Sequence, residues 1–205
     1  MNPIKLVVFD RDGTINEDRD DYVKSADEWL PLPGALEAIA RLNHAGWHAV
    51  VATNQSGIGR GLFEMAALNA MHAKMNRLLQ QAGGRIDAVF FCPHVDADGC
   101  DCRKPLPGLL HQIGERYGVD LSTVPVVGDS LRDLQAAAAA GCPAHLVATG
   151  KQKRPGSTRL PELLAQVPGA RAHDDLAAFA EFLIQSDRQA RIVAGTPDSG
   201  YAHLE

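Results

Sequence analysis

The chain has 205 residues, of which 45% are hydrophobic and 22% charged, and its formal net charge is −5. This length suits one α/β domain with a substantial core. The acidic balance excludes a general attraction to nucleic acid or to an anionic membrane surface, and no apolar run approaches the ~20 residues of a membrane helix. The first apolar run is also too short for a signal peptide. We therefore expect a cytoplasmic, monomeric protein with a small-molecule partner, without nucleic acid or membrane.

The first predicted element is a buried parallel strand over residues 6–9, because the run is short and rich in branched and aromatic side chains. It ends on Asp10 and Asp12, and Gly13 allows a sharp turn there. In open α/β sheets this edge is where ligands bind. Two carboxylates in one loop repel each other and need a cation or a shared proton. The stretch indicates a magnesium site with a nucleophile, and the alternative is a solvated acidic turn.

A polar segment over residues 17–23 follows, without clear periodicity, and we interpret it as a flap over the strand edge. A substrate contact there and an ordinary exposed acidic loop are equally open. Residues 33–42 have apolar positions at helical spacing, which predicts the first crossover helix.

The second predicted strand, residues 47–52, runs into Thr53, Asn54, Gln55 and Ser56. Short polar side chains and free backbone N–H groups at a strand end suit phosphate oxygens, and the alternative is an ordinary strand-to-loop turn. The glycines at 57–61 do not have the spacing or the position of a dinucleotide site. Arg60, which lies among them, is a candidate for contacting an anionic substrate.

An amphipathic helix is predicted over residues 64–81 and a third strand over 86–91. Four metal-binding side chains then fall within eleven positions: Cys92, His94, Cys100 and Cys102. Three thiols and one imidazole form a closed tetrahedral ligand set, which indicates structural zinc. The alternative, a disulfide between Cys100 and Cys102, would be badly strained. Cys142 is left over and is predicted to be a small buried hydrophobic residue.

Arg103 and Lys104 follow the last of these thiols directly. Zinc bound to the preceding loop would fix where the two cations point. Lys104 is then expected to act as a point charge on a phosphoryl group and on Asp10, while the planar fork of Arg103 binds a second anionic group. A helix is predicted over residues 109–117.

A fourth strand over residues 123–127 ends on a second acidic pair, Asp129 and Asp133. Asp129 comes straight off the strand and is the better magnesium ligand, with Asp133 in a supporting position behind it. The alternative makes Asp129 a helix N-cap. Helices at 134–140 and 174–185 and a fifth strand at 144–147 complete the pattern. We expect one domain over residues 1–185, a doubly wound parallel sheet of five strands, and a mobile tail over 186–205.

Taken together, these motifs resemble those of the haloacid dehalogenase superfamily, and within it the branch of sugar-bisphosphate and histidinol-phosphate phosphatases that carries a zinc loop. The resemblance covers residues 5–150. The stretch between the first motif and the second, and the stretch from there to the zinc loop, have no room for a large cap domain, so we expect a capless fold. The resemblance implies that Asp10 attacks phosphorus and that Asp12 transfers protons. It further implies that magnesium is held by Asp10, the main-chain carbonyl of Asp12 and Asp129, and that the phosphate and substrate contacts come from Thr53, Lys104, Asn54, Gln55, Ser56, Arg60, Arg103 and Ser130.

The implied activity is removal of the 7-phosphate from a heptose 1,7-bisphosphate through an aspartyl-phosphate intermediate. Histidinol phosphate is the alternative substrate. Two other classes compete with the phosphatase. A phosphoacceptor receiver domain carries its acceptor aspartate after the third strand, where this chain has Cys92. A zinc-finger nucleic-acid module conflicts with the acidic balance.

Overall fold

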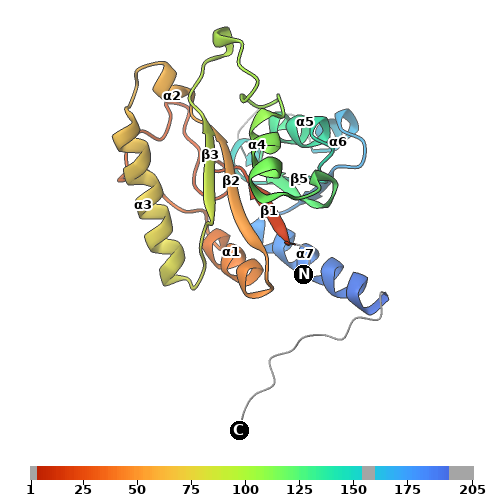
Figure 1. Ribbon diagram of the computed structural model, residues 1–205. Helices are drawn as coiled ribbons and strands as arrows, with labels where there is room; N and C mark the ends of the chain where they lie inside the picture. The colour runs from red at the N-terminus through yellow and green to blue at the C-terminus, as the bar shows by residue number, and fades with distance from the viewer. Residues whose placement is uncertain (1–3, 154–159, 194–205) are drawn as a thin grey trace.

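The computed structural model describes residues 4–153 and 160–193, and their strands form one parallel sheet (Figure 1). The sheet order is β3-β2-β1-β4-β5-β6, so the prediction of five strands was wrong by one. Its strands are β1 (Leu6–Phe9), β2 (His48–Asn54), β3 (Ala88–Cys92), β4 (Val126–Gly128), β5 (Ala144–Val147) and β6 (Arg171–His173). The missed strand, β6, is three residues long with two exposed side chains, so it lacks the apolar run that marks a buried strand.

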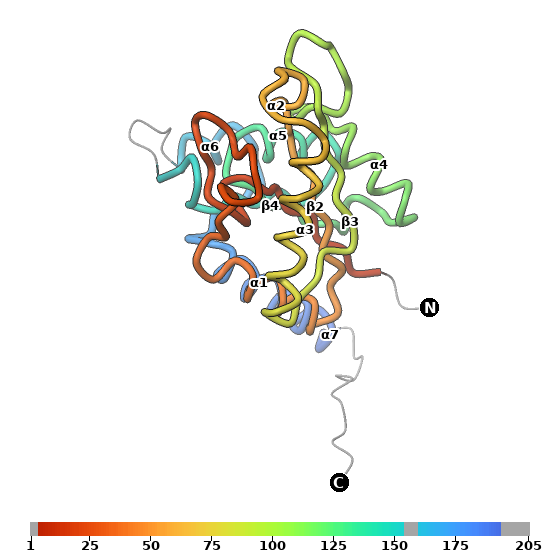
Figure 2. The backbone as a smooth tube through the Cα atoms, turned by 90° about the vertical axis from the view of Figure 1, so that its left-hand side faces the viewer, coloured from red at the N-terminus to blue at the C-terminus, as the bar shows by residue number. Residues whose placement is uncertain are grey.

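Helices cover both faces of the sheet (Figures 1 and 2). One face packs against α1 (Ala35–His44), α3 (Met65–Gln81) and α7 (Leu176–Val193). The other packs against α4 (Gly108–Tyr117), α5 (Leu131–Ala139) and α6 (Leu160–Gln166). This is the doubly wound α/β arrangement that the alternating pattern predicted.

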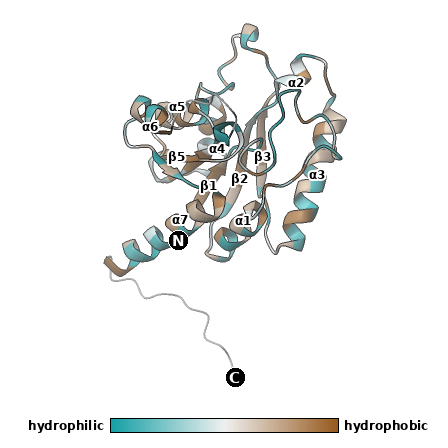
Figure 3. Cartoon of the chain, turned by 180° about the vertical axis from the view of Figure 1, so that it is seen from behind, coloured by the Kyte–Doolittle hydropathy of each residue, from teal (hydrophilic) through white to brown (hydrophobic). Residues whose placement is uncertain are grey.

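Successive residues of the central strand serve these two layers in turn. In β1, Val7 and Phe9 point into the cluster with α1, α3 and α7, whereas Leu6 and Val8 point into the cluster with α4 to α6. All four side chains are at most 1% exposed. A central parallel strand is apolar on both faces for this reason. Figure 3 accordingly shows hydrophobic (brown) strands inside the molecule and hydrophilic (teal) residues on the outer faces of the helices.

Several predicted boundaries differ from the structure. The fourth strand begins only at Val126, because Leu121–Thr123 forms a 3₁₀ turn whose first residue is preceded by the Asp120 cap. Helix α6 was not predicted. Helix α7 continues past the predicted end at residue 185 to Val193, and residues 194–205 of the expected tail lie outside the described residues. None of the helices in the described ranges combines the length and apolarity needed to cross a membrane.

Two histidines join the last two strands beneath α7. Nδ1 of His145 in β5 lies 3.0 Å from Nε2 of His173 in β6, and both rings pack against Phe179 and Phe182. Burial lowers the pKa of His145 to about 3 and also lowers that of His173. Because an unfolded histidine has a pKa of about 6.5, the unfolded chain binds more protons between these values.

The free energy of unfolding is therefore expected to fall as the pH drops below about 6.5. For His145 alone the loss between pH 7 and pH 5 is about 2 kcal/mol. Urea unfolding at both pH values measures it, and His145→Asn should lose less stability over this interval than the wild type. Replacement of the exposed His111 by Asn serves as the control. Equal pH dependence in wild type and His145→Asn would contradict this role.

Candidate active site

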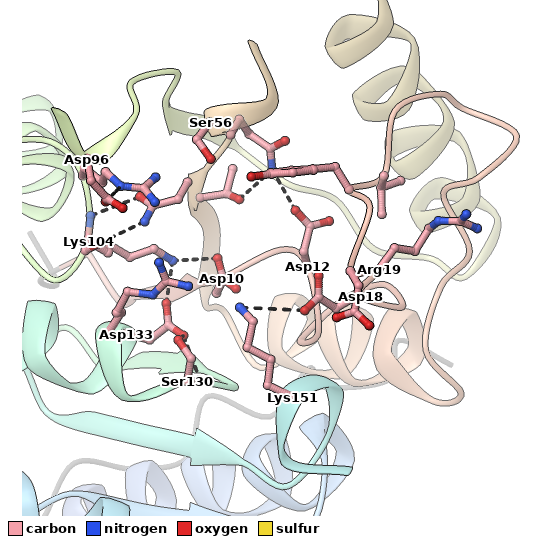
Figure 4. A pocket seen from close by; sticks show the side chains of 18 of the residues that line it. Asp10, Asp12, Asp18, Arg19, Ser56, Asp96, Lys104, Ser130, Asp133 and Lys151 are labelled. Atoms are coloured by element: carbon pink, nitrogen blue, oxygen red, sulfur yellow. Dashed lines mark hydrogen bonds and ion pairs between the residues drawn. The ribbon is translucent and has the colours of Figure 1, made fainter. Parts of the chain in front are cut away.

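The predicted site residues meet at the carboxyl edge of the sheet, around the strands where the chain order reverses. Asp10 follows β1 and Asp129 follows β4, which are neighbours, and Thr53 lies at the end of β2 on the other side of β1. A ligand crevice is expected at such a switch point. A cavity of about 350 Å³ opens there, and Figure 4 shows side chains of its wall.

The ammonium group of Lys104 is the centre of this wall. Its Nζ donates to Asp10 Oδ1 and to Asp133 Oδ1, both at 2.6 Å (Figure 4), and also to the Ala52 carbonyl at 2.9 Å. The side chain of Asn54 holds the Lys104 backbone from both sides, at 3.0 Å to its N–H and 3.0 Å to its carbonyl. Burial disfavours the charged lysine, but the two carboxylates outweigh it and raise the pKa of Lys104. The cation is therefore present and fixed.

Three carboxylates cluster here, and two of them, Asp10 and Asp133, pair with Lys104. Asp10, Asp129 and Asp133 each offer an oxygen within 4.8 Å of the others. Burial raises the pKa of Asp10 to about 6, partly opposed by Lys104. Burial and the neighbouring Asp133 and Asp10 raise the pKa of Asp129 to about 8. The cluster carries more negative charge than its surroundings compensate.

The surroundings of Asp129 fit a divalent cation. Its Oδ1 is buried and has no hydrogen-bond partner among the described residues, whereas Oδ2 accepts the Lys151 N–H at 2.7 Å. Gly13 and Gly150 both have positive φ and press against this carboxylate, so that a Cβ at either would collide with it. Oxygen ligands with a free lone pair in an anionic, crowded niche are what Mg²⁺ prefers. The alternative role of Asp129 as a helix cap was wrong, because Ser130 is the N-cap of α5.

Asp12 is held from three sides. Arg11 binds both of its carboxylate oxygens, Asn16 donates to Oδ1 at 2.9 Å, and Gln55 donates to Oδ2 at 2.8 Å. Burial alone would raise the pKa of Asp12, but Arg11 and these amides together lower it. Arg11 and Asn16 were not predicted as site residues, because nothing in the sequence pattern distinguishes them from ordinary loop residues.

The four polar residues predicted to follow the second strand all line the cavity, with different contacts, although β2 itself extends through Thr53 and Asn54. Thr53 is 1% exposed, and its Oγ1 accepts from Gln55 at 3.0 Å. Asn54 is engaged with Lys104 as described. Ser56 begins the short helix α2 (Ser56–Gly59). Ser130 also lines the cavity, and both its N–H and its hydroxyl bind Asp133.

Arginines line another part of the cavity. Arg60 and Arg103, both predicted, are joined there by Arg132 from the first turn of α5. Arg103 Nε donates to Asp96, and its Nη1 donates to the His94 carbonyl at 3.3 Å. Arg132 was missed, although it lies between the predicted Ser130 and Asp133 and faces the same edge.

The flap and the loop after β5 also reach the cavity. Asp18, Asp20 and Tyr22 line it, and so does Lys151, whose Nζ lies 3.7 Å from Asp18 Oδ2 (Figure 4). Residues around 151 were not predicted to belong to the site. The available signal was their position after the end of a parallel strand, which places them at the same edge as the acidic pairs.

The four predicted zinc ligands form one cluster in the loop after β3. Their ligand atoms lie within 4.8 Å of one another, and the Sγ–Sγ and Sγ–Nδ1 distances recorded among them run from 3.0 to 3.6 Å. Tetrahedral zinc with bonds of about 2.0–2.3 Å needs donor spacings of this order. All four cysteines of the chain are free, so the Cys100–Cys102 disulfide is not formed, and Cys142 is buried in the core as predicted.

This loop is tied to the site by backbone hydrogen bonds. Gln55 N donates to the Cys92 carbonyl at 2.7 Å, and Gly59 N donates to the Pro93 carbonyl at 3.0 Å. Figures 1 and 2 both show the loop beside α2. These hydrogen bonds therefore connect the segment that carries Gln55 to the loop that continues into Lys104.

Known proteins resemble this chain closely. The sequence model of the haloacid dehalogenase-like hydrolases matches residues 15–141. The D-glycero-beta-D-manno-heptose-1,7-bisphosphate 7-phosphatase of Bordetella bronchiseptica is 58% identical over 89% of this chain and 99% of its own length, and that of Pseudomonas aeruginosa is 54% identical over 88% and 98%. The crystal structure of the B. bronchiseptica phosphatase with magnesium and phosphate superposes with a TM-score of 0.82, at 57% identity, over 89% of this chain and 99% of that one. The chain belongs to the haloacid dehalogenase-like hydrolase family.

Proposed function

We propose that the protein is a magnesium-dependent phosphomonoesterase that removes the 7-phosphate of D-glycero-D-manno-heptose 1,7-bisphosphate. The observation that carries the reaction type is Lys104, which joins Asp10 and Asp133 beside Asp129 at the sheet edge. The substrate is supported by the names of relatives more than 50% identical over nearly their whole length. A receiver-type role lacks its acceptor, because β3 ends on Cys92 within the thiol cluster.

In the first step the Asp10 carboxylate attacks the phosphorus of the substrate. A bond forms between Asp10 and phosphorus as the ester bond to the sugar oxygen breaks. The negative charge of the bound phosphate favours the protonated form of Asp12, which donates its proton to that oxygen. Lys104 and Thr53 hold the phosphoryl oxygens. The cation compensates charge that grows on these oxygens, which is the kind of stabilisation on which phosphoryl transfer depends.

In the second step water hydrolyses the aspartyl phosphate. Asp12, now ionised, takes a proton from the water, whose oxygen bonds to phosphorus while the bond to Asp10 breaks. Inorganic phosphate leaves and both aspartates return to their first state. The hydrogen bonds from Gln55 and Asn16 keep Asp12 in place between the two steps.

Asp10, the main-chain carbonyl of Asp12 and Asp129 would hold the magnesium ion, supported by Asp133. The ion supplies positive charge where three carboxylates and a phosphate meet. The free lone pairs of Asp129 Oδ1 support this assignment.

We propose zinc, with a structural role, for Cys92, His94, Cys100 and Cys102. All four positions of a tetrahedral ion are then filled by protein, so no open position is left for substrate. The ion would fix the segment that continues into Arg103 and Lys104. We also propose a single capless domain. Residues 10–34, all of them described, contain only isolated β-bridges and no helix or strand.

The substrate assignment is tested by measuring kcat/KM for heptose 1,7-bisphosphate and for histidinol phosphate with the same magnesium-loaded protein. The proposal expects a clear preference for the bisphosphate. A preference for histidinol phosphate would contradict the proposed substrate but leave the proposed phosphatase reaction in place. No steady release of phosphate from either would contradict the phosphatase.

Arg103→Ala is expected to reduce kcat/KM for the heptose bisphosphate by about 10- to 100-fold, and for the corresponding heptose 7-monophosphate much less. A guanidinium that binds the second phosphate makes a charge-assisted pair worth about 1.5–3 kcal/mol, and only the bisphosphate has that group. Arg60→Ala tests the second candidate, and Arg77→Ala, exposed on α3 and outside the cavity, is the control. Equal losses on both substrates would remove this role.

A further inference from the structure

Arg11 stands between the two aspartates of the opening loop and is among the largest side chains that are fully buried. Its guanidinium meets Asp12 as a fork: Nε donates to Oδ1 at 3.1 Å, and Nη2 lies 2.9 Å from each carboxylate oxygen. Nη1 lies 3.3 Å from Nε2 of His72 on α3. Burying a guanidinium is costly unless its donors are paired, so these contacts account for its presence in the interior.

Arg11 does not line the cavity, whereas Asp12 does. Arg11 therefore reaches the cavity through its hydrogen bonds to Asp12. A fork that shares two oxygens with a carboxylate fixes the plane of that carboxylate, which a single donor leaves free to rotate. The contact with His72 holds the other edge of the guanidinium against α3. The position of the Asp12 carboxylate is therefore set by a helix that packs in the core.

We propose that Arg11 is a positioning residue for the proton transfers of Asp12, and that His72 positions Arg11. The inference rests on the proposed function. When the ester bond breaks, the Asp12 O–H bond breaks and the sugar oxygen gains the proton; in hydrolysis a water O–H bond breaks and Asp12 gains it. Both transfers need the carboxyl oxygen in one place, and a misplacement of about 1 Å costs about 10²-fold in rate.

The test compares two substrates that need the proton to different degrees. The sugar oxygen of heptose 1,7-bisphosphate leaves as a poorly stabilised alkoxide and needs the proton. The phenolate of p-nitrophenyl phosphate is a good leaving group and does not. Arg11→Met is expected to lower kcat/KM for the heptose substrate about 100-fold and for p-nitrophenyl phosphate less than tenfold. Arg11→Lys, which keeps the charge but loses the fork, should lose about tenfold on the heptose substrate only.

His72 provides a second pair of variants, which decides the matter if Arg11→Met does not fold. His72→Gln keeps an acceptor for Arg11 and should stay within about twofold of the wild type. His72→Leu removes it and should lose about five- to tenfold on the heptose substrate, with p-nitrophenyl phosphate unaffected.

Equal losses on both substrates would assign Arg11 a merely structural role and overturn the inference, as would full activity of Arg11→Lys. A wild-type protein that releases phosphate from neither substrate would instead overturn the proposed function. Thermal unfolding of every variant, with Arg77→Met as the charge-removal control on α3, separates loss of fold from loss of positioning.

Discussion

Asp10→Asn is expected to lower phosphate release at least about a thousandfold, which corresponds to about 4 kcal/mol of transition-state stabilisation. An amide keeps the size of the side chain but cannot attack phosphorus. The change also removes one of three crowded carboxylates, while Lys104 keeps Asp133 as its partner. The variant should therefore be at least as resistant to thermal unfolding as the wild type.

The measurement is steady-state release of inorganic phosphate in magnesium, together with acid quenching of a reaction with radiolabelled substrate. The wild type should yield labelled protein and Asp10→Asn none. Asp27→Asn, an exposed carboxylate outside the cavity, is the matched control and should keep full activity. Residual turnover above about one part in a thousand would mean that another group is the nucleophile.

Removing the zinc site should have the second large effect. Cys102→Ala is expected to abolish stoichiometric zinc and to reduce activity about 100-fold or more. Cys102 directly precedes Arg103 and Lys104, so losing its bond to zinc would release the segment that carries both cations. Binding of a structural zinc ion also stabilises the folded chain, and this stabilisation would be lost as well. A displacement of the Lys104 ammonium by about 1 Å is enough for a loss of this size.

Cys142→Ala is the matched control, because Cys142 is about as buried as Cys102, at 6% and 8% exposed, but lies outside the ligand cluster. It should keep about one zinc per chain and lose only about 1 kcal/mol of stability. Metal content by elemental analysis, thermal unfolding and phosphate release are measured on each protein. An empty site in freshly purified, reduced wild type, or full activity of Cys102→Ala, would contradict the structural role of zinc.

The chain by itself determined the class of fold and most of the candidate site. Strands such as residues 6–9 are apolar on both faces, which requires helices on both sides of the sheet. Parallel strands end at one edge, so the polar residues after each strand had to meet there. Thr53, Asp10 and Asp129 do so. The zinc ligands could be predicted because three thiols and one imidazole so close together in the sequence are typical of a structural zinc site.

Only the tertiary structure decided which residues support that edge. Arg11 has the sequence appearance of a solvated cation and is instead fully buried against Asp12. Lys151 and Arg132 follow the carboxyl ends of β5 and β4, and the packing of these segments turns both side chains into the cavity. Strand β6 pairs with β5 at the edge of the sheet through backbone hydrogen bonds, which do not require the apolar side chains that mark a strand in the sequence. Local patterns report what a residue buries, whereas the partner of a charge is set by contacts between segments distant in the chain.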